Sequence, residues 1–235
     1  MKAVILASGA ATRLRPLTDN VPKCLVEVNG EPILGRMLKS LESHGIEDVL
    51  ITTGHLGRMI EEYVSRNFPH LNVEYVTNPK FSETNYIYSL WLAKDRLDSD
   101  IILMHGDLVY DWGILGKLLK GKRSIVPINN TVPPPKKDFK GLVKDGKVIR
   151  VGVKVFGEGA FFLAPMYRLS KEDLASWMEE ISKFVERGEV KCYAEDAFNM
   201  VSHKMDIRPL YYGEELCMEV DDHSDLEIAN KVLSK

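Results

Sequence analysis

Short apolar runs alternate with longer stretches of helical spacing through the first half of the chain. The runs at 3–6, 49–52, 73–76 and 101–104 are expected strands, and the stretches at 33–41, 56–64 and 87–97 are expected helices. Strands that alternate with helices predict right-handed crossovers and a mainly parallel sheet. In such a sheet, ligands bind at the carboxyl ends of the strands.

The pattern changes after about residue 122. The stretch PINNTVPPPKKDFKG is a proline-rich loop, and LVKDGKVIRVGVKV predicts a hairpin that turns at Asp145-Gly146. One more strand is expected in GAFFLAPMY, followed by helices at 171–186 and 195–203, strands at 206–211 and 217–220, and a last helix from residue 224. We therefore predict a single α/β domain over residues 1–235. Its sheet is Rossmann-like, mixed but mainly parallel and flanked by helices, with a small lobe from the second half that returns a strand to the sheet.

Composition narrows the class of protein. The chain has 235 residues, 45% hydrophobic and 28% charged, with a formal net charge of −3. This is an ordinary globular profile that does not suggest a nucleic-acid binder. Cys24, Cys192 and Cys217 lack metal or disulfide spacing, and no stretch approaches membrane-spanning length. We expect a cytoplasmic protein without a membrane partner.

The loop after the first strand carries the first candidate chemistry. Small residues follow the strand and leave backbone N–H groups open to anionic oxygens. Arg13 can fork onto two phosphate oxygens, and Lys23 can add a point charge from the other side. We expect this loop to wrap a triphosphate, although a solvated surface turn is the alternative. The expected cradle is Leu6, Ala7, Ser8, Gly9, Ala10, Ala11 and Thr12.

This stretch is neither a Walker A loop nor a dinucleotide-binding fingerprint. It resembles the signature of the nucleotidylyltransferases that activate sugar phosphates and related small phosphates. The match covers Gly9, Thr12, Arg13, Pro16, Thr18, Pro22 and Lys23. Ala11 stands where the family usually has a second glycine, so it costs roughly 1 kcal/mol of strain if φ is positive there. The resemblance implies the nucleotide-diphospho-sugar transferase fold, with residues 1–122 binding the nucleotide and 123–235 facing the acceptor.

Two acidic residues far apart in the sequence are candidate metal ligands. Asp107 follows the expected strand at 101–104, and Asp221 ends the one at 217–220. The resemblance implies that they hold Mg²⁺, which usually takes one or two carboxylates together with phosphate oxygens and water. The alternatives are a turn residue for Asp107 and a helix N-cap for Asp221. His105 occupies a position where relatives often carry an acid, and a neutral imidazole there would reduce the local negative charge.

The segment from Thr84 to Leu92 indicates the subfamily. It resembles the corresponding helix start of bacterial choline-phosphate cytidylyltransferases and of related enzymes that activate aminoethylphosphonate. Thr84 or Asn85 can cap the helix, and polar side chains there can reach a pyrimidine edge. We expect Thr84, Asn85 and Ser89 to contact the nucleotide.

A second group of residues is expected to bind the acceptor. A quaternary ammonium group favours an aromatic box with a nearby carboxylate. The candidates are Phe139, Tyr193 and Phe198, with Glu195 and Asp196, and ordinary packing is the alternative for the aromatic residues. Lys154 resembles the family lysine that meets the acceptor phosphate, with a solvated strand-edge lysine as the alternative.

Together these features predict a monomeric or homodimeric cytidylyltransferase. An acceptor phosphate or phosphonate oxygen would attack the α-phosphorus of CTP and release pyrophosphate, with Arg13 and Lys23 as the catalytic cations and Mg²⁺ as cofactor. The acceptor phosphate is ionised near neutral pH, so no general base is needed. The alternatives are a sugar-1-phosphate nucleotidylyltransferase that uses UTP or dTTP, and a non-catalytic nucleotide sensor.

Overall fold

A computed structural model describes residues 1–134 and 136–234. A ten-stranded mixed sheet runs through the molecule in the order β10-β9-β11-β8-β12-β6-β1-β4-β5, with β13 paired to β8. The strands of this sheet are β1 Lys2–Leu6, β4 Asp48–Thr53, β5 Asn72–Thr77, β6 Ile101–His105, β8 Ile125–Asn129, β9 Lys140–Lys144, β10 Lys147–Gly152, β11 Ala160–Leu163, β12 Met166–Leu169 and β13 Arg208–Tyr212.

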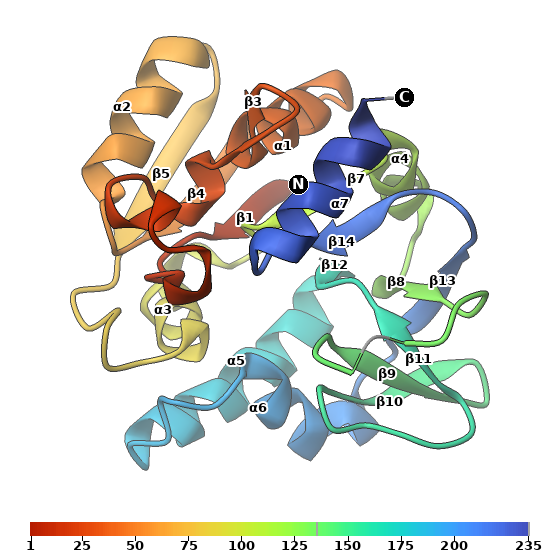
Figure 1. Ribbon diagram of the computed structural model, residues 1–235. Coiled ribbons are helices and arrows are strands. Elements are labelled where there is room, and N and C mark those ends of the chain that lie inside the picture. The colour runs from red at the N-terminus through yellow and green to blue at the C-terminus, as the bar shows by residue number, and fades with distance from the viewer. Residues whose placement is uncertain (135, 235) are drawn as a thin grey trace.

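Helices cover both faces of this sheet. Figure 1 shows α1 and α2 on one side and α5 and α6 on the other. The α-helices are α1 Ile33–Ser43, α2 Gly57–Asn67, α3 Tyr86–Leu92, α4 Trp112–Lys120, α5 Lys171–Glu186, α6 Ala194–Val201 and α7 His223–Leu233. Short 3-10 turns occupy Thr12–Leu14, Leu17–Asp19, Lys23–Leu25, Lys94–Arg96 and Ser202–Lys204.

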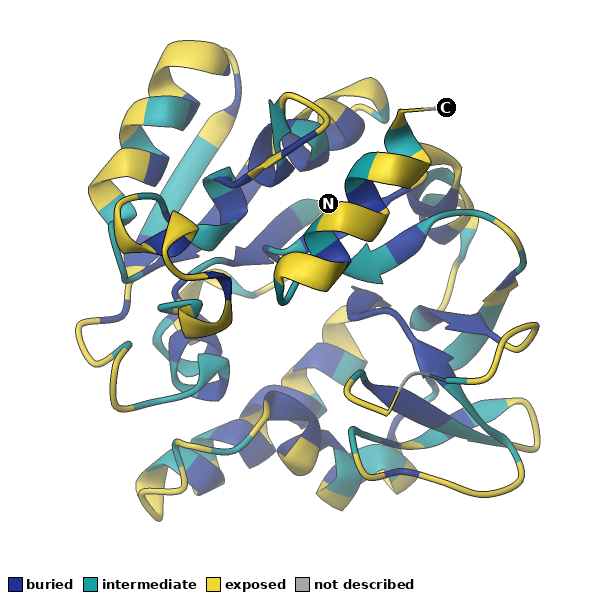
Figure 2. Cartoon of the chain, viewed as in Figure 1, coloured by how far each residue is buried: buried dark blue, intermediate teal, exposed yellow. Residues whose placement is uncertain are grey.

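The hydrophobic core divides into two layers because side chains alternate across a strand. Ala3 and Ile5 of β1 pack with the buried faces of α1, α2 and α4, whereas Val4 and Leu6 pack with those of α3, α5 and α6. Figure 2 shows the strands buried and the outer faces of the helices exposed. The sheet therefore holds β1 rigidly from both sides, which fixes the loop that follows Leu6.

The four strands predicted in the first half are confirmed. β6, β1, β4 and β5 are parallel neighbours, and Leu6 lies opposite Thr52 on one side and His105 on the other. Three strand ends thus meet at one edge of the sheet. The predicted helix at 87–97 is shorter than expected, because α3 ends at Leu92 and a 3-10 turn follows.

Two predictions in the second half were wrong. GAFFLAPMY forms two strands, β11 and β12, which are separated at Ala164-Pro165. β11 pairs with β9, whereas β12 pairs with β6. The proline-rich loop also begins later than expected, because Pro127 lies within β8. That strand persists because the Pro127 carbonyl still accepts a hydrogen bond from the Ala164 N–H at 3.2 Å.

The hairpin predicted at Asp145-Gly146 is confirmed. Both residues have positive φ, 51° and 69°, as a two-residue turn that matches the twist of its strands requires. The last helix and the strand near 217–220 are also present, as α7 and β14 Cys217–Glu219.

Two small sheets complete the fold. β2 Glu27–Val28 pairs with β3 Glu31–Pro32, and β14 pairs antiparallel with β7 Leu108–Tyr110. The Val220 N–H donates to the Asp107 carbonyl at 3.0 Å, which extends this pairing beyond the strands. The pairing brings the sequence around Asp221 beside the end of β6.

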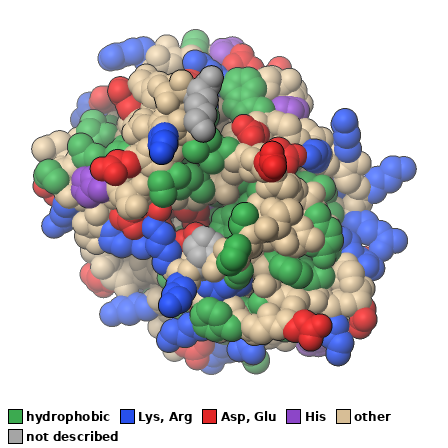
Figure 3. Space-filling view, turned by 45° about the vertical axis from the view of Figure 1, so that its right-hand side comes forward, with side chains coloured by type: hydrophobic (Ala, Val, Ile, Leu, Met, Phe, Trp, Pro, Cys, Tyr) green, Lys and Arg blue, Asp and Glu red, His purple; other side chains and the backbone are tan. Residues whose placement is uncertain are grey.

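Several sequence-based expectations stay predictions. The division at residue 122 is one, since the second half supplies strands to the same sheet as the first. A cytoplasmic location and the absence of nucleic acid are others. Basic, acidic and hydrophobic side chains are interspersed over the face in Figure 3. Among the described residues, no helix combines the length and apolar character needed to cross a membrane.

Candidate active site

A cavity of about 340 Å³ opens where β1 and β6 end. This is the edge at which ligands bind in open α/β sheets, and the volume suits a small-molecule site. Its wall is formed by Leu6, Ala7, Ser8, Gly9, Ala11, Arg13, Lys23, Cys24, Phe81, Thr84, Asn85, Tyr86, His105, Gly106, Asp107, Lys137, Phe139, Val153, Tyr193, Glu219 and Asp221.

The loop after β1 forms one wall of the cavity. A Cβ atom built on Gly9 would meet no protein atom within 4 Å, so the missing side chain leaves open space beside the backbone. A Cβ atom on Gly106 would lie 2.9 Å from the Leu6 carbonyl oxygen, so this glycine lets the β6 turn approach the loop. The small residues thus serve two purposes, access for a ligand and close packing of two strand ends.

Ala11 adopts the left-handed conformation, with φ 48° and ψ 48°. The Ala11 carbonyl accepts hydrogen bonds from the Leu14 N–H at 3.2 Å and from the Thr18 hydroxyl at 2.8 Å, and these bonds hold the conformation. A side chain in this region costs about 1–2 kcal/mol. The position is therefore one where glycine is favoured, and the alanine carries the strain foreseen from the sequence.

Lys23 joins the two acidic candidates. Its ammonium group pairs with Asp107 and lies 2.6 Å from Oδ1 of Asp221, and Arg13 lies 2.8 Å from the same oxygen. Burial opposes the charge on Lys23, but the two carboxylates outweigh burial and raise its pKa above the usual value. The residues predicted as catalytic cations and as metal ligands therefore form one charged cluster.

The two aspartates fit a divalent cation. One oxygen of Asp107 pairs with Lys23, while its other oxygen, Oδ1, is buried without a hydrogen-bond partner among the described residues. Burial disfavours the charged form of Asp107, but Lys23, His105 and a backbone hydrogen bond together outweigh burial, so the pKa is lowered and the group stays ionised. An all-oxygen set of two carboxylates open to a cavity is suited to Mg²⁺. Asp222, not Asp221, caps α7, which leaves the Asp221 carboxylate for the cavity.

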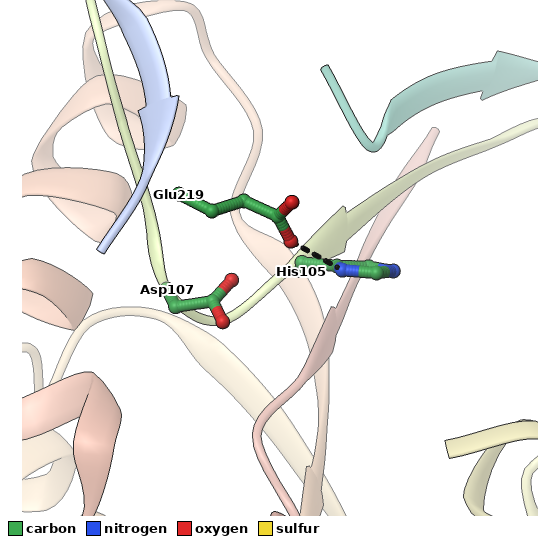
Figure 4. Close-up of side chains that lie close together, drawn as sticks. All are labelled: His105, Asp107 and Glu219. Carbon is green, nitrogen blue, oxygen red and sulfur yellow. Dashed lines mark hydrogen bonds and ion pairs between the residues drawn. The ribbon is translucent and has the colours of Figure 1, made fainter. Parts of the chain in front are cut away.

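His105 and Glu219 form an ion pair beside Asp107. Figure 4 shows Glu219 reaching from β14 toward His105, and their Nδ1 and Oε1 atoms are 3.0 Å apart. Burial opposes protonation of His105, but Glu219 outweighs it and raises the pKa of His105 to about 9. The expectation of a neutral imidazole was therefore wrong. Ligand atoms of His105, Asp107 and Glu219 lie within 4.8 Å of one another, but a protonated imidazole has no lone pair for a metal, so only the two carboxylates of this group are candidate ligands.

Aromatic rings line another part of the cavity wall. The ring of Tyr193 lies 5.0 Å from that of Phe139 and 5.9 Å from that of Tyr86, measured between centroids. Glu195 lies behind this wall, only 2% exposed, and accepts hydrogen bonds from the hydroxyls of Tyr86 and Tyr167. This part of the wall is thus aromatic, with buried negative charge nearby.

Most of the predicted site residues line this cavity. The structure brings together Leu6, Ala7, Ser8, Gly9, Ala11, Arg13, Lys23, Thr84, Asn85, Asp107, Phe139, Tyr193 and Asp221. Ala10 and Thr12 lie in the same loop but outside the lining. The role of each of these predicted residues toward a ligand stays a prediction.

Three other predicted contact residues, Ser89, Phe198 and Lys154, do not line the cavity. Ser89 is fully buried and its hydroxyl lies 2.7 Å from that of Ser8, so it supports the loop from behind. Phe198 is a core residue that packs on Trp177, because α6 turns this face toward α5. Lys154 lies exposed in the turn after β10, and its neighbour Val153 is the residue that reaches the cavity.

Two predicted acidic contacts, Glu195 and Asp196, are also absent from the cavity lining. Glu195 does not line the cavity, since its carboxylate is enclosed by tyrosine hydroxyls. Asp196 is used locally, because its carboxylate accepts the Tyr193 N–H at 3.0 Å and completes the cap of α6.

Sequence reasoning missed several wall residues, among them Phe81, Lys137 and Glu219. Lys137 comes from the proline-rich loop and pairs with Asp222 at 2.8 Å and Asp225 at 2.6 Å. Periodicity carries no signal for such a loop. Glu219 could have been identified, because it lies two residues before Asp221 and side chains at i and i+2 of a strand share a face.

Comparisons with known proteins identify relatives of this chain. The chain is 36% identical over 118 residues to the CMP-5'-(3-aminopropyl)phosphonate synthase of Streptomyces rubellomurinus, which covers 50% of this chain and 19% of the relative. It is 39% identical over 103 residues to the choline-phosphate cytidylyltransferase of Streptococcus pneumoniae, which covers 44% and 43%. The chain thus matches less than half the length of these relatives.

The fold comparison extends over the whole chain. The solved structure of the CTP:phosphocholine cytidylyltransferase from Streptococcus pneumoniae superposes with a TM-score of 0.82 at 24% identity, covering 99% of this chain and 98% of that one. The family model described as "Nucleotidyl transferase" matches residues 2–124, which contain the loop, Lys23 and Asp107. The chain therefore belongs to the nucleotidyl transferase family.

Proposed function

We propose that this protein is a cytidylyltransferase. It would transfer CMP from CTP to a small phosphorylated amino alcohol or an aminoalkylphosphonate and release pyrophosphate. The observation that carries the proposal is the meeting of the open loop, two cations and two carboxylates in one cavity. Such a site binds a polyphosphate and a divalent cation together.

The roles of the loop and its cations follow from their placement. Backbone N–H groups beside Gly9 would receive phosphate oxygens without interference from side chains. The Arg13 side chain is 60% exposed, so it can move from Asp221 onto the triphosphate at little desolvation cost. Lys23 is held beside both aspartates and would stabilise charge that develops on the α-phosphate and the leaving pyrophosphate.

Asp107 and Asp221 would hold the metal ion. When bound, Mg²⁺ supplies charge neutralisation between the nucleophile and the α-phosphate. The acceptor phosphate or phosphonate is already ionised near neutral pH, so positioning and electrostatics are sufficient for an in-line attack.

The acceptor end of the cavity favours a cationic head group. Tyr86, Phe139 and Tyr193 present aromatic rings, and Glu195 and Glu219 place negative charge around them. Cations are stabilised by aromatic faces and by nearby carboxylates. The names of the two relatives, a choline-phosphate enzyme and an aminopropylphosphonate enzyme, point to the same class of acceptor.

A pyrophosphate-release assay tests the proposal. CTP, UTP and dTTP are each combined with phosphocholine, 2-aminoethylphosphonate and glucose 1-phosphate in the presence of Mg²⁺. The proposal expects release from CTP with one of the two amino acceptors. Release only with glucose 1-phosphate would favour the sugar enzyme, and nucleotide binding without release for any acceptor would favour a non-catalytic sensor.

A further inference from the structure

A buried hydrogen-bond network lies behind one side of the cavity. Asn78, which is 1% exposed, donates from its amide nitrogen to the hydroxyls of Ser89 at 2.9 Å and Thr84 at 3.0 Å. Ser89 in turn contacts the hydroxyl of Ser8 in the loop after β1. One side chain therefore links the loop to the segment at the start of α3, and both segments line the cavity.

This network fixes the role of the Thr84 hydroxyl. A hydroxyl has one proton, and that of Thr84 goes to the Lys80 carbonyl at 2.9 Å. The amide of Asn78 cannot be turned around, because its oxygen accepts the Lys80 N–H at 2.8 Å. The Thr84 hydroxyl can therefore only accept from a ligand, through the one lone pair that is left, and Thr84 is a residue of the cavity wall.

The side chain of Asn85, the next residue, is fixed as a hydrogen-bond donor. The side-chain oxygen of Asn85 accepts the Tyr86 N–H at 2.7 Å, so its other terminal atom must be the NH₂ group. That NH₂ group has no hydrogen-bond partner among residues 1–134 and 136–234, and Asn85 lines the cavity beside Thr84. An acceptor and a donor of settled polarity thus stand next to each other on the wall.

We propose that Thr84 and Asn85 select cytosine over uracil at this wall. Cytosine presents a donor, its 4-amino group, beside an acceptor, N3, whereas uracil presents the acceptor O4 beside the donor N3–H. With the base in the register that places position 4 against Thr84 and N3 against Asn85, the wall complements cytosine and opposes uracil at both positions. Asn78 and Lys80 maintain that order without touching the base. This proposal rests on the proposed use of CTP and assigns the choice of cytosine to Thr84 and Asn85.

The test uses nucleotide binding and turnover in parallel. Isothermal titration with CTP and with UTP, in Mg²⁺ and without acceptor, is performed on the wild type, Thr84→Val, Thr84→Ser and Thr77→Val. Thr84→Val removes the acceptor while keeping the shape, and Thr84→Ser keeps the hydroxyl. Thr77→Val is the matched control, because its hydroxyl is 3.1 Å from that of Thr53 and does not line the cavity.

We expect the wild type to bind CTP more tightly than UTP. In Thr84→Val, the ratio of the UTP to the CTP dissociation constant should fall about tenfold. The variant loses one neutral hydrogen bond to cytosine and no longer opposes O4 of uracil. Thr84→Ser should keep most of the preference, and Thr77→Val should equal the wild type. Circular dichroism melting confirms that each variant is folded at the assay temperature.

Two outcomes would overturn the inference: equal wild-type affinity for the two nucleotides, or an unchanged CTP preference in Thr84→Val. Failure of the proposed function looks different. In that case the wild type releases no pyrophosphate from CTP with any acceptor, and the binding preference still decides whether Thr84 and Asn85 read the base.

Discussion

The Nζ atom of Lys23 lies 2.6 Å from Oδ1 of Asp221, although 198 positions separate the two residues in the sequence. The same ammonium group also pairs with Asp107. Lys23 therefore neutralises the same two carboxylates that are proposed to bind the metal ion. This relationship makes Lys23 and the metal partly interchangeable as counter-ions, which leads to the first prediction.

Lys23→Ala should lower turnover by at least about a hundredfold, as expected for loss of a group that stabilises transition-state charge. It should also lower the melting temperature without ligand, because Asp107 and Asp221 then repel each other. Mg²⁺ should restore the melting temperature of Lys23→Ala more than it raises that of the wild type. Lys117→Ala, which removes an exposed ion pair with Glu215, is the control. Near-normal turnover in Lys23→Ala would contradict the assignment.

Asp107→Asn and Asp221→Asn should each raise the Mg²⁺ concentration needed for half-maximal activity by at least about tenfold, since even residues outside a metal's ligand shell have effects of this size. Direct titration of Mn²⁺ binding by electron paramagnetic resonance checks the result independently of turnover. Asp222→Asn is the matched control, because asparagine also caps helices well and Asp222 lies outside the cavity lining. Equal Mn²⁺ affinity in all three variants would exclude the proposed site.

Ala11→Gly should stabilise the protein by up to about 1 kcal/mol, because glycine removes the strain of the left-handed conformation but loses more chain entropy on folding. Ala10→Gly should instead destabilise it by about 0.5–1 kcal/mol, since Ala10 is absent from the residues with positive φ. Urea unfolding measures both variants. Stabilisation in Ala10→Gly but not in Ala11→Gly would be incompatible with the backbone described.

Tyr193→Ala should raise the KM for a cationic acceptor about 3–30-fold, the range for loss of one cation–aromatic contact, and leave the KM for CTP unchanged. Tyr193 is 40% exposed and Tyr211 is 47% exposed, so Tyr211→Ala provides a matched control outside the cavity. Steady-state kinetics with either substrate varied separates the two constants. A change in the KM for CTP alone would move Tyr193 to the nucleotide end.

The sequence predicted the residues proposed for the nucleotide better than those proposed for the acceptor. The carboxyl ends of parallel strands meet at one edge of a sheet. Residues close to such strand ends, in the loop after β1, at Asp107 and at the start of α3, could therefore be placed together from the sequence. Asp221 could be joined to them only through the family resemblance, because its position depends on the β7–β14 pairing.

The placement of the residues proposed for the acceptor depends on tertiary contacts that local patterns do not encode. Glu195 and Phe198 lie on a short helix whose spacing allows several orientations, and packing on α5 turned both inward. Lys154 was expected on a strand but follows its end, and strand ends are the least certain feature of a pattern. The His105 ion pair arose from Glu219, a residue 114 positions away.

A crystal structure with CTP and Mg²⁺ tests the central claim most directly, namely that the loop after β1 and two distant aspartates hold one metal-bound triphosphate. The account predicts the metal between Asp107 and Asp221, the phosphates against Gly9 and Ala11, and Arg13 turned from Asp221 onto the triphosphate. A triphosphate bound elsewhere, or a metal that contacts neither aspartate, would contradict it.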